Sequence, residues 1–310
     1  MGGFDMKKWI YLLMIFGLFI LGGCNLFSGL DEEDLDGSSF DYKLEESMAS
    51  GDYNEVTKLV AEKIAGTPDL KAIDNTLKVY EPDDWSTATF DELEDYYEEL
   101  KSYYASNSNE SVEYYIELKL NEAGANLGLA GLKMTDIVAQ ITEATKTTSK
   151  VADESEIELG ELVPNGLNSD YLTKAIKAYI MGLPANEVKE KYELYYLNGA
   201  LSSAISSINR AIQIFAVDPN ESEIVFKKWS NLINEDKTEW NGLVSSTKME
   251  LTVAKELLQL YINSNSEAID LEDANEIEAK ITTLIGTIKT FSLESDYTAF
   301  TSAAGITVEP

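Results

Sequence analysis

The sequence predicts an all-α protein whose antiparallel helical hairpins stack as an α-solenoid or as an irregular helical bundle. Apolar residues recur at spacings of three and four in every long segment, which is typical of amphipathic helices. Glycine, proline and polar N-cap residues separate these segments, and none shows the alternation of a half-buried strand. With 44% hydrophobic residues, 17 Tyr and 10 Phe, the chain has enough apolar surface to build a core.

The first residues have the pattern of a secretory signal. Lys7 and Lys8 precede an apolar run that ends at Leu21-Gly22-Gly23-Cys24. A basic start, a short apolar stretch and small residues before the cleavage point define such a signal, so residues 1–23 are predicted to be a signal peptide. The alternative is an uncleaved anchor, because counting on to Phe27 gives a run long enough to span a bilayer.

Cys24 is the only cysteine in the chain, so no disulfide explains its position. Small residues followed directly by this cysteine resemble the lipobox of bacterial lipoproteins. The resemblance implies that the thiol of Cys24 is acylated and that the chain is cut before it. Membrane lipid would then hold the protein in the bacterial cell envelope, facing the periplasm or the exterior.

Residues 24–39 are predicted to be an acidic, flexible tether, since they are rich in acidic and small residues and lack periodicity. Glu32, Asp34 and Asp36 approach the spacing of a calcium-binding loop. The closing position of that loop would fall on Lys43, where calcium needs a glutamate. We therefore favour a plain spacer and predict no metal site.

The first helical hairpin is predicted around Gly51 and Tyr53. Gly51 permits the positive φ of a tight turn, Val56 and Val60 follow at helical spacing, and Pro68 cannot continue a helix. Residues 40–68 resemble one tetratricopeptide repeat, with Gly51 and Tyr53 at the turn and Pro68 at the exit of the second helix. The resemblance implies stacked hairpins with a concave face that docks a protein partner.

Two helices are predicted next along the chain. Thr89 and Glu92 form a capping box at the head of a helix that runs to about Tyr104. A second helix begins near Glu110 and carries one apolar face. The residues of that face are Val112, Ile116, Leu120, Ala123, Leu127 and Ala130. Residues 160–166, rich in glycine and proline, then interrupt the helical pattern.

After this break, helices are predicted over 171–180 and, beyond Gly182 and Pro184, over 188–215. Asp218-Pro219-Asn220-Glu221 combines an N-cap aspartate with proline in the first turn, so the next helix is predicted to start there. Apolar stripes indicate helices over 240–261 and 277–288.

The predicted helical domain therefore spans residues 40–292, either as one unit or as halves 40–160 and 167–292. Residues 293–310 are predicted to be a C-terminal tail. Small residues follow a Leu-Asn step at both 120–128 and 197–204. An ancient duplication would explain this similarity, and so would close packing, since small residues let helix axes approach to about 8 Å. We favour close packing over a ligand-lining role for these residues.

Six tyrosines crowd the two helices that follow Thr89, and glutamates lie among them. Aromatic faces and carboxylates together could hold a sugar or a cationic peptide, so these tyrosines are a candidate ligand or partner face. Packing between stacked hairpins is the favoured alternative. The tyrosines are Tyr96, Tyr97, Tyr103, Tyr104, Tyr114 and Tyr115.

Composition restricts the chemistry that the chain can perform. Histidine is absent, which excludes Ser-His-Asp catalysis and the usual zinc sites. The net charge of −31 disfavours contact with nucleic acid. A glycosidase needs two carboxylates across a cleft, and no pair stands out among 55 acidic residues. The sequence predicts no catalytic residue, no cofactor and no nucleic-acid partner.

The expected function is therefore that of a non-enzymatic, lipid-anchored interaction scaffold or transporter accessory. The alternative is a solute-binding lipoprotein of a transport system, with a pocket lined by tyrosine and glutamate. A protein partner should be basic, because complementary potentials speed encounter and acid against acid is costly to desolvate. In the other interpretation the acidic residues only keep the protein soluble, and the contact surface is apolar and aromatic.

The lipid anchor can be tested directly at the predicted acylation site. Cys24→Ser removes the thiol, so the precursor should remain uncleaved and should incorporate no labelled fatty acid. Gel mobility and metabolic labelling measure both effects. A Cys24→Ser protein that is still cleaved and still sediments with membranes would contradict the lipoprotein interpretation.

Overall fold

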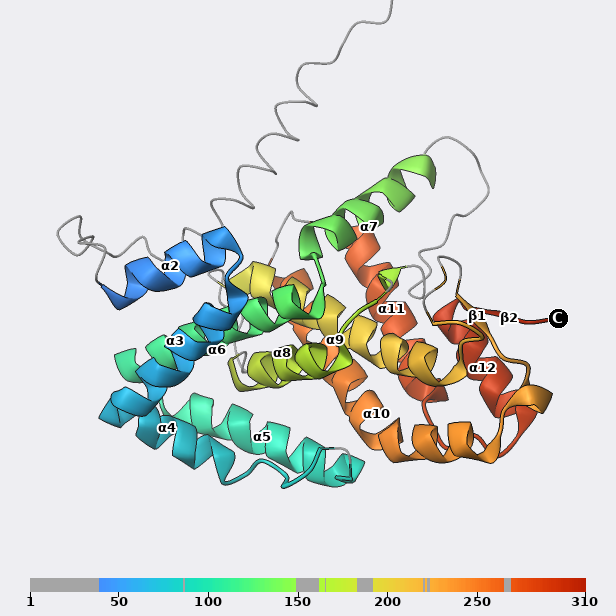
Figure 1. The fold of residues 1–310 in the computed structure, drawn as a ribbon, viewed down its shortest axis with the longest axis horizontal. Helices are drawn as coiled ribbons and strands as arrows, with labels where there is room; N and C mark the ends of the chain where they lie inside the picture. The colour runs from blue at the N-terminus through green and yellow to red at the C-terminus, as the bar shows by residue number, and fades with distance from the viewer. Residues whose placement is uncertain are drawn as a thin grey trace, which may run out of the picture.

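The computed structural model describes residues 39–310 except 86, 149–161, 165, 183–191, 220, 222–223 and 265–268. These residues form eleven α-helices, one 3-10 turn and two strands of two residues each, so the all-α prediction is confirmed (Figure 1). The helices are α2 (Phe40–Ser50), α3 (Tyr53–Gly66), α4 (Pro68–Lys78), α5 (Phe90–Ser106), α6 (Glu110–Ala130), α7 (Met134–Thr148), α8 (Ser169–Gly182), α9 (Glu193–Phe215), α10 (Asn234–Asn263), α11 (Leu271–Thr287) and α12 (Glu294–Ala304).

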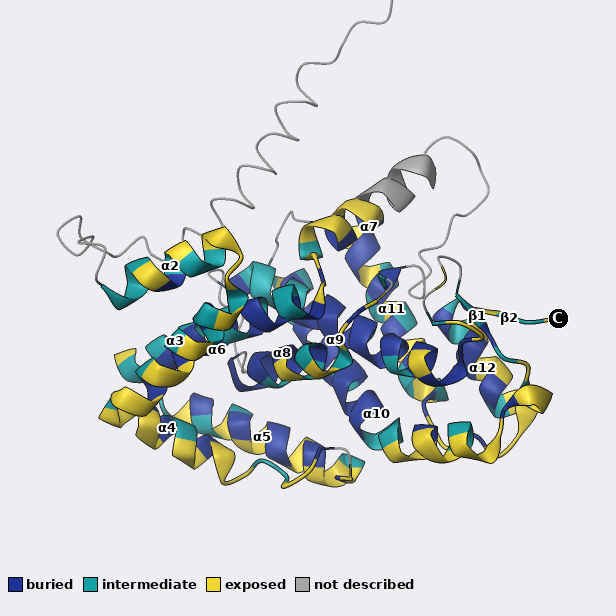
Figure 2. Cartoon of the chain, in the orientation of Figure 1, coloured by how far each residue is buried: buried dark blue, intermediate teal, exposed yellow. Residues whose placement is uncertain are grey.

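Helix α9 lies at the centre of the fold and is buried along nearly its whole length (Figure 2). It packs along α10 on one side and against α8 on the other. Helix α8 in turn packs against α6, and α6 against α3. On the far side, α10 contacts α11, which contacts α12. The described helices therefore form one series around a single hydrophobic core.

The predicted hairpin around Gly51 is present as α2 and α3. Gly51 ends α2 with φ of 76°, a conformation that costs glycine little because it has no Cβ. Asp52 caps α3, accepting a hydrogen bond from the Glu55 backbone N–H. Pro68 does not simply follow α3, because it occupies the first turn of α4, where its missing N–H costs nothing.

Capping also fixes the start of the next two helices. Thr89 and Glu92 form the predicted capping box at the head of α5, with the Thr89 backbone N–H donating to Glu92 Oε2 at 2.8 Å. Asn109 caps α6 by accepting from the Val112 backbone N–H. The predicted apolar face of α6 is buried in full.

One contact distinguishes this fold from an open solenoid. Helix α5 packs against α10, although some 140 residues separate them in sequence. Lys101 Nζ on α5 lies 3.4 Å from Glu256 Oε2 on α10. In a solenoid each repeat contacts only its neighbours. Of the two predicted forms, the irregular bundle therefore describes the chain.

Small residues let helices approach closely at two points of this bundle. A Cβ added to Gly128 of α6 would lie 2.2 Å from Tyr53 Cε2, so the ring of Tyr53 occupies the space above this glycine. A Cβ added to Gly199 of α9 would lie 2.8 Å from Leu257 Cδ1 and 3.3 Å from Tyr179 Cδ1. Close packing thus accounts for the small residues in both stretches.

The predicted helix start at Asp218-Pro219 is wrong. The chain instead turns back, so that Ala216 and Phe226 form an antiparallel bridge and helix α10 begins only at Asn234. The Val217 backbone N–H donates to the Val225 carbonyl at 2.9 Å. The local capping residues do not start a helix here, because an extended backbone allows Phe226 to become fully buried.

The predicted C-terminal tail at 293–310 is also wrong. Strand β2 (Thr307–Val308) pairs in parallel with β1 (Val225–Phe226), and helix α12 precedes it. Tyr297 and Phe300 of α12 are buried in a cluster of aromatic rings. The other rings of this aromatic cluster are Phe215, Phe226, Trp240 and Phe291. The domain therefore extends past residue 292.

Helices on both sides of the predicted break at 160–166 share the core. The backbone N–H of Asn168 donates to the Ala130 carbonyl, and α8 packs against α6. Helix α9 is described from Glu193, so the predicted start at Val188 lies outside the described residues. The predicted signal peptide, Cys24 and all but the last residue of the tether also lie outside them.

The close approach at Gly199 predicts opposite outcomes for two glycine substitutions. Gly199→Ala should lower the free energy of unfolding. Overpacking a core costs about 1–3 kcal/mol, which is more than alanine contributes through its higher helix propensity. Gly242→Ala on α10 should raise it by about 0.5–1 kcal/mol, since this exposed helical glycine has open space around its Cβ. Urea unfolding followed by circular dichroism measures both changes. Equal signs would contradict the close-packing account.

Candidate functional site

The six candidate tyrosines do not form one open face. Tyr96, Tyr97, Tyr104 and Tyr115 are buried in the core, and Tyr103 and Tyr114 are half-buried. Three hydroxyls are tied to other helices: Tyr115 donates to Asp74 at 3.0 Å, Tyr114 to Asp41 at 3.4 Å, and Tyr104 to the Met181 carbonyl. Burial raises the pKa of all six, so their hydroxyls stay neutral. These residues mainly pack the core.

Tyr96 is buried in the core but also lines a cleft of about 450 Å³ between α5 and the segment that joins α4 to α5. Its ring is 2% exposed, and its hydroxyl makes no hydrogen bond with any described residue. Tyr80, which is 40% exposed, lines the same cleft. We call this the acidic cleft, after its five carboxylates: Asp83, Asp84, Glu92, Asp95 and Glu99.

Among the residues that the structure describes, no lysine or arginine lines the acidic cleft. Glu92, Asp95 and Glu99 lie three and four residues apart, which places them along one face of α5. None of these three carboxylates forms an ion pair within the described part of the chain. Hydrogen bonds from the Thr89 backbone and hydroxyl lower the pKa of Glu92, so it stays ionised. Glu92, Asp95 and Glu99 therefore give the acidic cleft negative charge that no ion pair among the described residues neutralises.

The segment beside this cleft is held in place by Trp85. Its indole N–H donates to Glu81 Oε1 at 3.0 Å. Its ring and that of Tyr96 pack edge to face, with their centroids 5.8 Å apart. Lys177 of α8 lies over the Trp85 ring at 4.7 Å and pairs with Glu81 at 3.2 Å. Trp85 thus links the α4–α5 segment to both α5 and α8.

A second cleft, of about 440 Å³, lies on the other side of this segment. Trp85, Asp83 and Asp84 form one wall, and α8, α9 and α10 form the rest. We call it the polar cleft, because Arg210 lines it together with hydroxyl groups from α8 and α10. Asp83 and Asp84 line both clefts.

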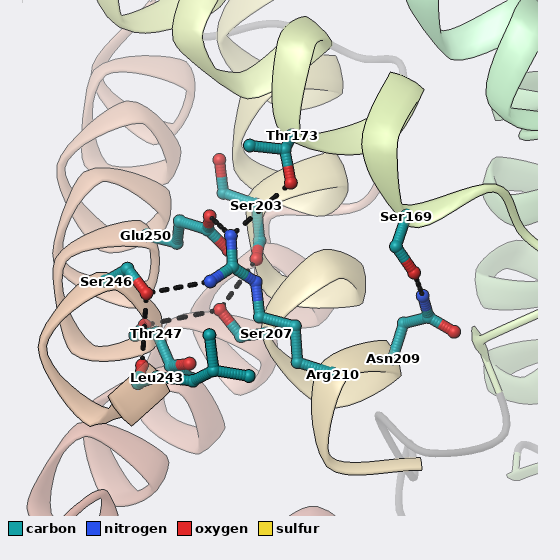
Figure 3. A network of polar contacts seen from close by, with 10 residues as sticks. All are labelled: Ser169, Thr173, Ser203, Ser207, Asn209, Arg210, Leu243, Ser246, Thr247 and Glu250. Atoms are coloured by element: carbon teal, nitrogen blue, oxygen red, sulfur yellow. Dashed lines mark hydrogen bonds and ion pairs between the residues drawn. The ribbon is translucent and has the colours of Figure 1, made fainter. Parts of the chain in front are cut away.

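Arg210 is the only arginine in the chain and the centre of a buried polar network (Figure 3). Its guanidinium donates to Ser246 Oγ at 2.7 Å, to Glu250 Oε1 at 2.5 Å and to Thr173 Oγ1 at 3.5 Å. The Arg210 side chain is 12% exposed and that of Glu250 is 1% exposed. The ion pair therefore joins α9 to α10 in the interior, with Arg210 reaching the polar cleft.

The sequence reasoning missed this network. A guanidinium presents five donors in a fixed planar fork, whereas a lysine ammonium presents three from a single nitrogen. A single arginine among 23 lysines, set in the apolar and small-residue run of α9, was the signal that could have found it. Glu250 gave no such signal, since it is one of many glutamates.

Burial is the main cause of the raised pKa of Glu250, and the charge of Arg210 and the Ser206 hydroxyl oppose it. Nearby, the Ser203 and Thr247 hydroxyls have no hydrogen-bond partner among the described residues. Ser207 does donate, to the Ser203 and Thr247 carbonyls. The α9–α10 interface thus holds buried polar groups beside Arg210 and Ser246, which both line the polar cleft.

In the described part of the chain, no helix has the length and apolar character required to cross a bilayer. Across these same residues, no group of three or more histidine, cysteine, aspartate or glutamate side chains is placed to hold a metal ion. Comparisons with protein-family models, with curated proteins and with solved structures found no match.

Removing one member of the buried ion pair should destabilise the fold in a pH-dependent way. Arg210→Met leaves Glu250 buried without its cation, which costs about 3–5 kcal/mol at neutral pH. The lost cation raises the pKa of Glu250 further, so the native state takes up a proton as pH falls and the cost shrinks. Urea unfolding at pH 7.5 and pH 5 measures this difference.

The double variant Arg210→Met/Glu250→Leu is the control, because it removes both charges. It should be more stable than Arg210→Met at pH 7.5 and should lose the extra pH dependence. If Arg210→Met lowered the free energy of unfolding equally at both pH values, protonation of Glu250 would not explain its effect.

Proposed function

We propose that this protein is a non-enzymatic, lipid-anchored component of the bacterial cell envelope that docks a basic segment of a partner protein in its acidic cleft. The observation that carries the proposal is the cleft itself. Five carboxylates line it together with Tyr80 and Tyr96, and no lysine or arginine of the described residues does. A lysine- or arginine-rich segment is the complement of such a surface.

The location part of this proposal rests on the N-terminal sequence. The signal pattern that ends at Cys24 supports export and acylation. Helix α2 is capped by Ser39, so fifteen residues separate the cysteine from the first described helix. Such a spacer would let the bundle reach a partner beside the membrane.

The charge of the whole chain supports a basic partner. With a net charge of −31, the surface attracts cations over a distance of about 10 Å at 0.1 M salt. The absence of histidine supports a binding role over the commonest catalytic ones. A general acidic coat, however, would attract any basic protein equally, so the test must separate the cleft from the coat.

Two variants of α5 with the same net charge distinguish binding in the acidic cleft from attraction to the acidic surface as a whole. Asp95→Asn/Glu99→Gln removes two carboxylates from the cleft, and Asp91→Asn/Glu94→Gln removes two exposed ones outside it. Each of these two carboxylates would form an exposed ion pair with a lysine of the peptide, and two such pairs contribute about 1 kcal/mol to binding. The first variant should therefore bind a lysine-rich peptide about fivefold more weakly. The second should bind like the natural chain. Fluorescence anisotropy at low salt measures both.

Affinity should also fall as salt rises from 0.02 to 0.5 M, because screening shortens the reach of the carboxylates. Equal losses for the two variants would show that the acid acts only as a coat. Binding that is indifferent to salt would show that the tyrosines, not the carboxylates, make the contact.

A further inference from the structure

We propose that the polar cleft is a second binding site, which holds a small zwitterion: a free α-amino acid or a dipeptide. The carboxylate of the ligand would lie against Arg210 and Lys177, and its ammonium group would lie at the acidic rim. This site is distinct from the acidic cleft and from the docking of a protein segment.

The cations that line the polar cleft are more buried than the carboxylates that line it. Arg210 and Lys177 are partly buried, with side chains 12% and 32% exposed. The carboxylates of Asp170 and Glu239 belong to exposed residues. Both cations are therefore more buried than these two carboxylates, and each is also paired with a carboxylate, Arg210 with Glu250 and Lys177 with Glu81. A ligand with an anionic head and a cationic group next to it matches this order.

Arg210 still has donors for such a ligand. A guanidinium carries five N–H donors, and three of them have acceptors within the described residues. The ion pair with Glu250 and the bond to Ser246 hold the group in one orientation. Little side-chain entropy would then be lost when a carboxylate binds. The hydroxyls of Thr173 and Ser246 line the same wall.

A ligand of a single charge fits this cleft less well. A simple anion would have to pass the acidic rim of a chain with a net charge of −31. A simple cation would meet Arg210 and Lys177 inside and would leave their donors unused. A ligand with both charges can pair its carboxylate with Arg210 and Lys177 and its ammonium group with the acidic rim.

The dimensions and apolar lining of the polar cleft restrict the ligand further. A volume of about 440 Å³ is near the lower end of the range for ligand pockets, which is about 300–1,000 Å³. Ile214 and Leu243 line the cleft together with Trp85, so an apolar side chain has a surface to cover. An amino acid or dipeptide is of the right size class.

The test uses the full chain in detergent micelles and isothermal titration calorimetry. The probes are the twenty common amino acids and their glycyl dipeptides, each at millimolar concentration, followed by the methyl ester and the N-acetyl form of the tightest binder. We expect at least one parent compound to bind and each derivative to bind at least tenfold more weakly. No binding by any parent compound overturns the proposal. An ester that retains affinity shows a cation site, and an N-acetyl form that retains it shows an anion site; either result also overturns the proposal.

Three variants locate the binding in the polar cleft. Lys177→Gln should weaken the tightest binder about tenfold, and Glu239→Gln should weaken it at least threefold. Glu235→Gln is the matched control on α10, because this exposed residue does not line the cleft. Lys177 also contacts Trp85 and Glu81, so thermal unfolding of each variant shows whether the fold is intact. Unchanged binding in both Lys177→Gln and Glu239→Gln overturns the proposal.

The same variants separate this site from the acidic cleft. Asp95→Asn/Glu99→Gln should leave amino-acid binding unchanged, since neither residue lines the polar cleft. Glu239→Gln should leave the affinity for the lysine-rich peptide unchanged, because Glu239 does not line the acidic cleft. Each proposal can therefore fail while the other stands.

Discussion

The fold depends on the burial of α9 between α8 and α10. Its small residues bring the neighbouring helices close, so that Gly199 lies directly against Tyr179 and Leu257. This proximity creates a tight, largely apolar interior, and such an interior makes an unpaired charge costly. Arg210 and Glu250 are tolerated there because they are paired with each other and hydrogen-bonded to hydroxyls. Arg210 lines the polar cleft, whereas Glu250 stays buried behind it.

Local rules predicted the helices well where the chemistry is local. The capping box at Thr89, the turn at Gly51 and the apolar face of α6 depend only on residues close in sequence. The errors arose where distant residues decide. Asp218-Pro219 has every local sign of a helix start, yet the pairing of Phe226 with the segment at Val308 holds the chain extended. The aromatic residues of α12 likewise show their role only beside Phe215.

The two candidate clefts could be predicted only in part. The sequence showed that tyrosines and carboxylates crowd α5, but not that the tyrosines turn inward while Glu92, Asp95 and Glu99 turn outward with Tyr96 between them. The periodicity of α5 predicts which of its faces is buried, but it does not predict which of its acidic residues lie beside the segment that joins α4 to α5. The polar cleft draws its walls from segments more than 150 residues apart, so no short pattern could indicate it.

The pairing of β1 with β2 places a condition on the order in which the chain folds. Phe226 takes its neighbours from both directions of the sequence, and Tyr297 closes the cluster from some 70 residues downstream. Contacts of such long range form slowly, because loop closure must precede them. Until residues 294–308 are available, Phe215, Phe226 and Trp240 have an open side. A nascent chain would therefore keep this end of the core open, and chaperones that bind exposed aromatic groups could reach it until residues 294–308 have folded.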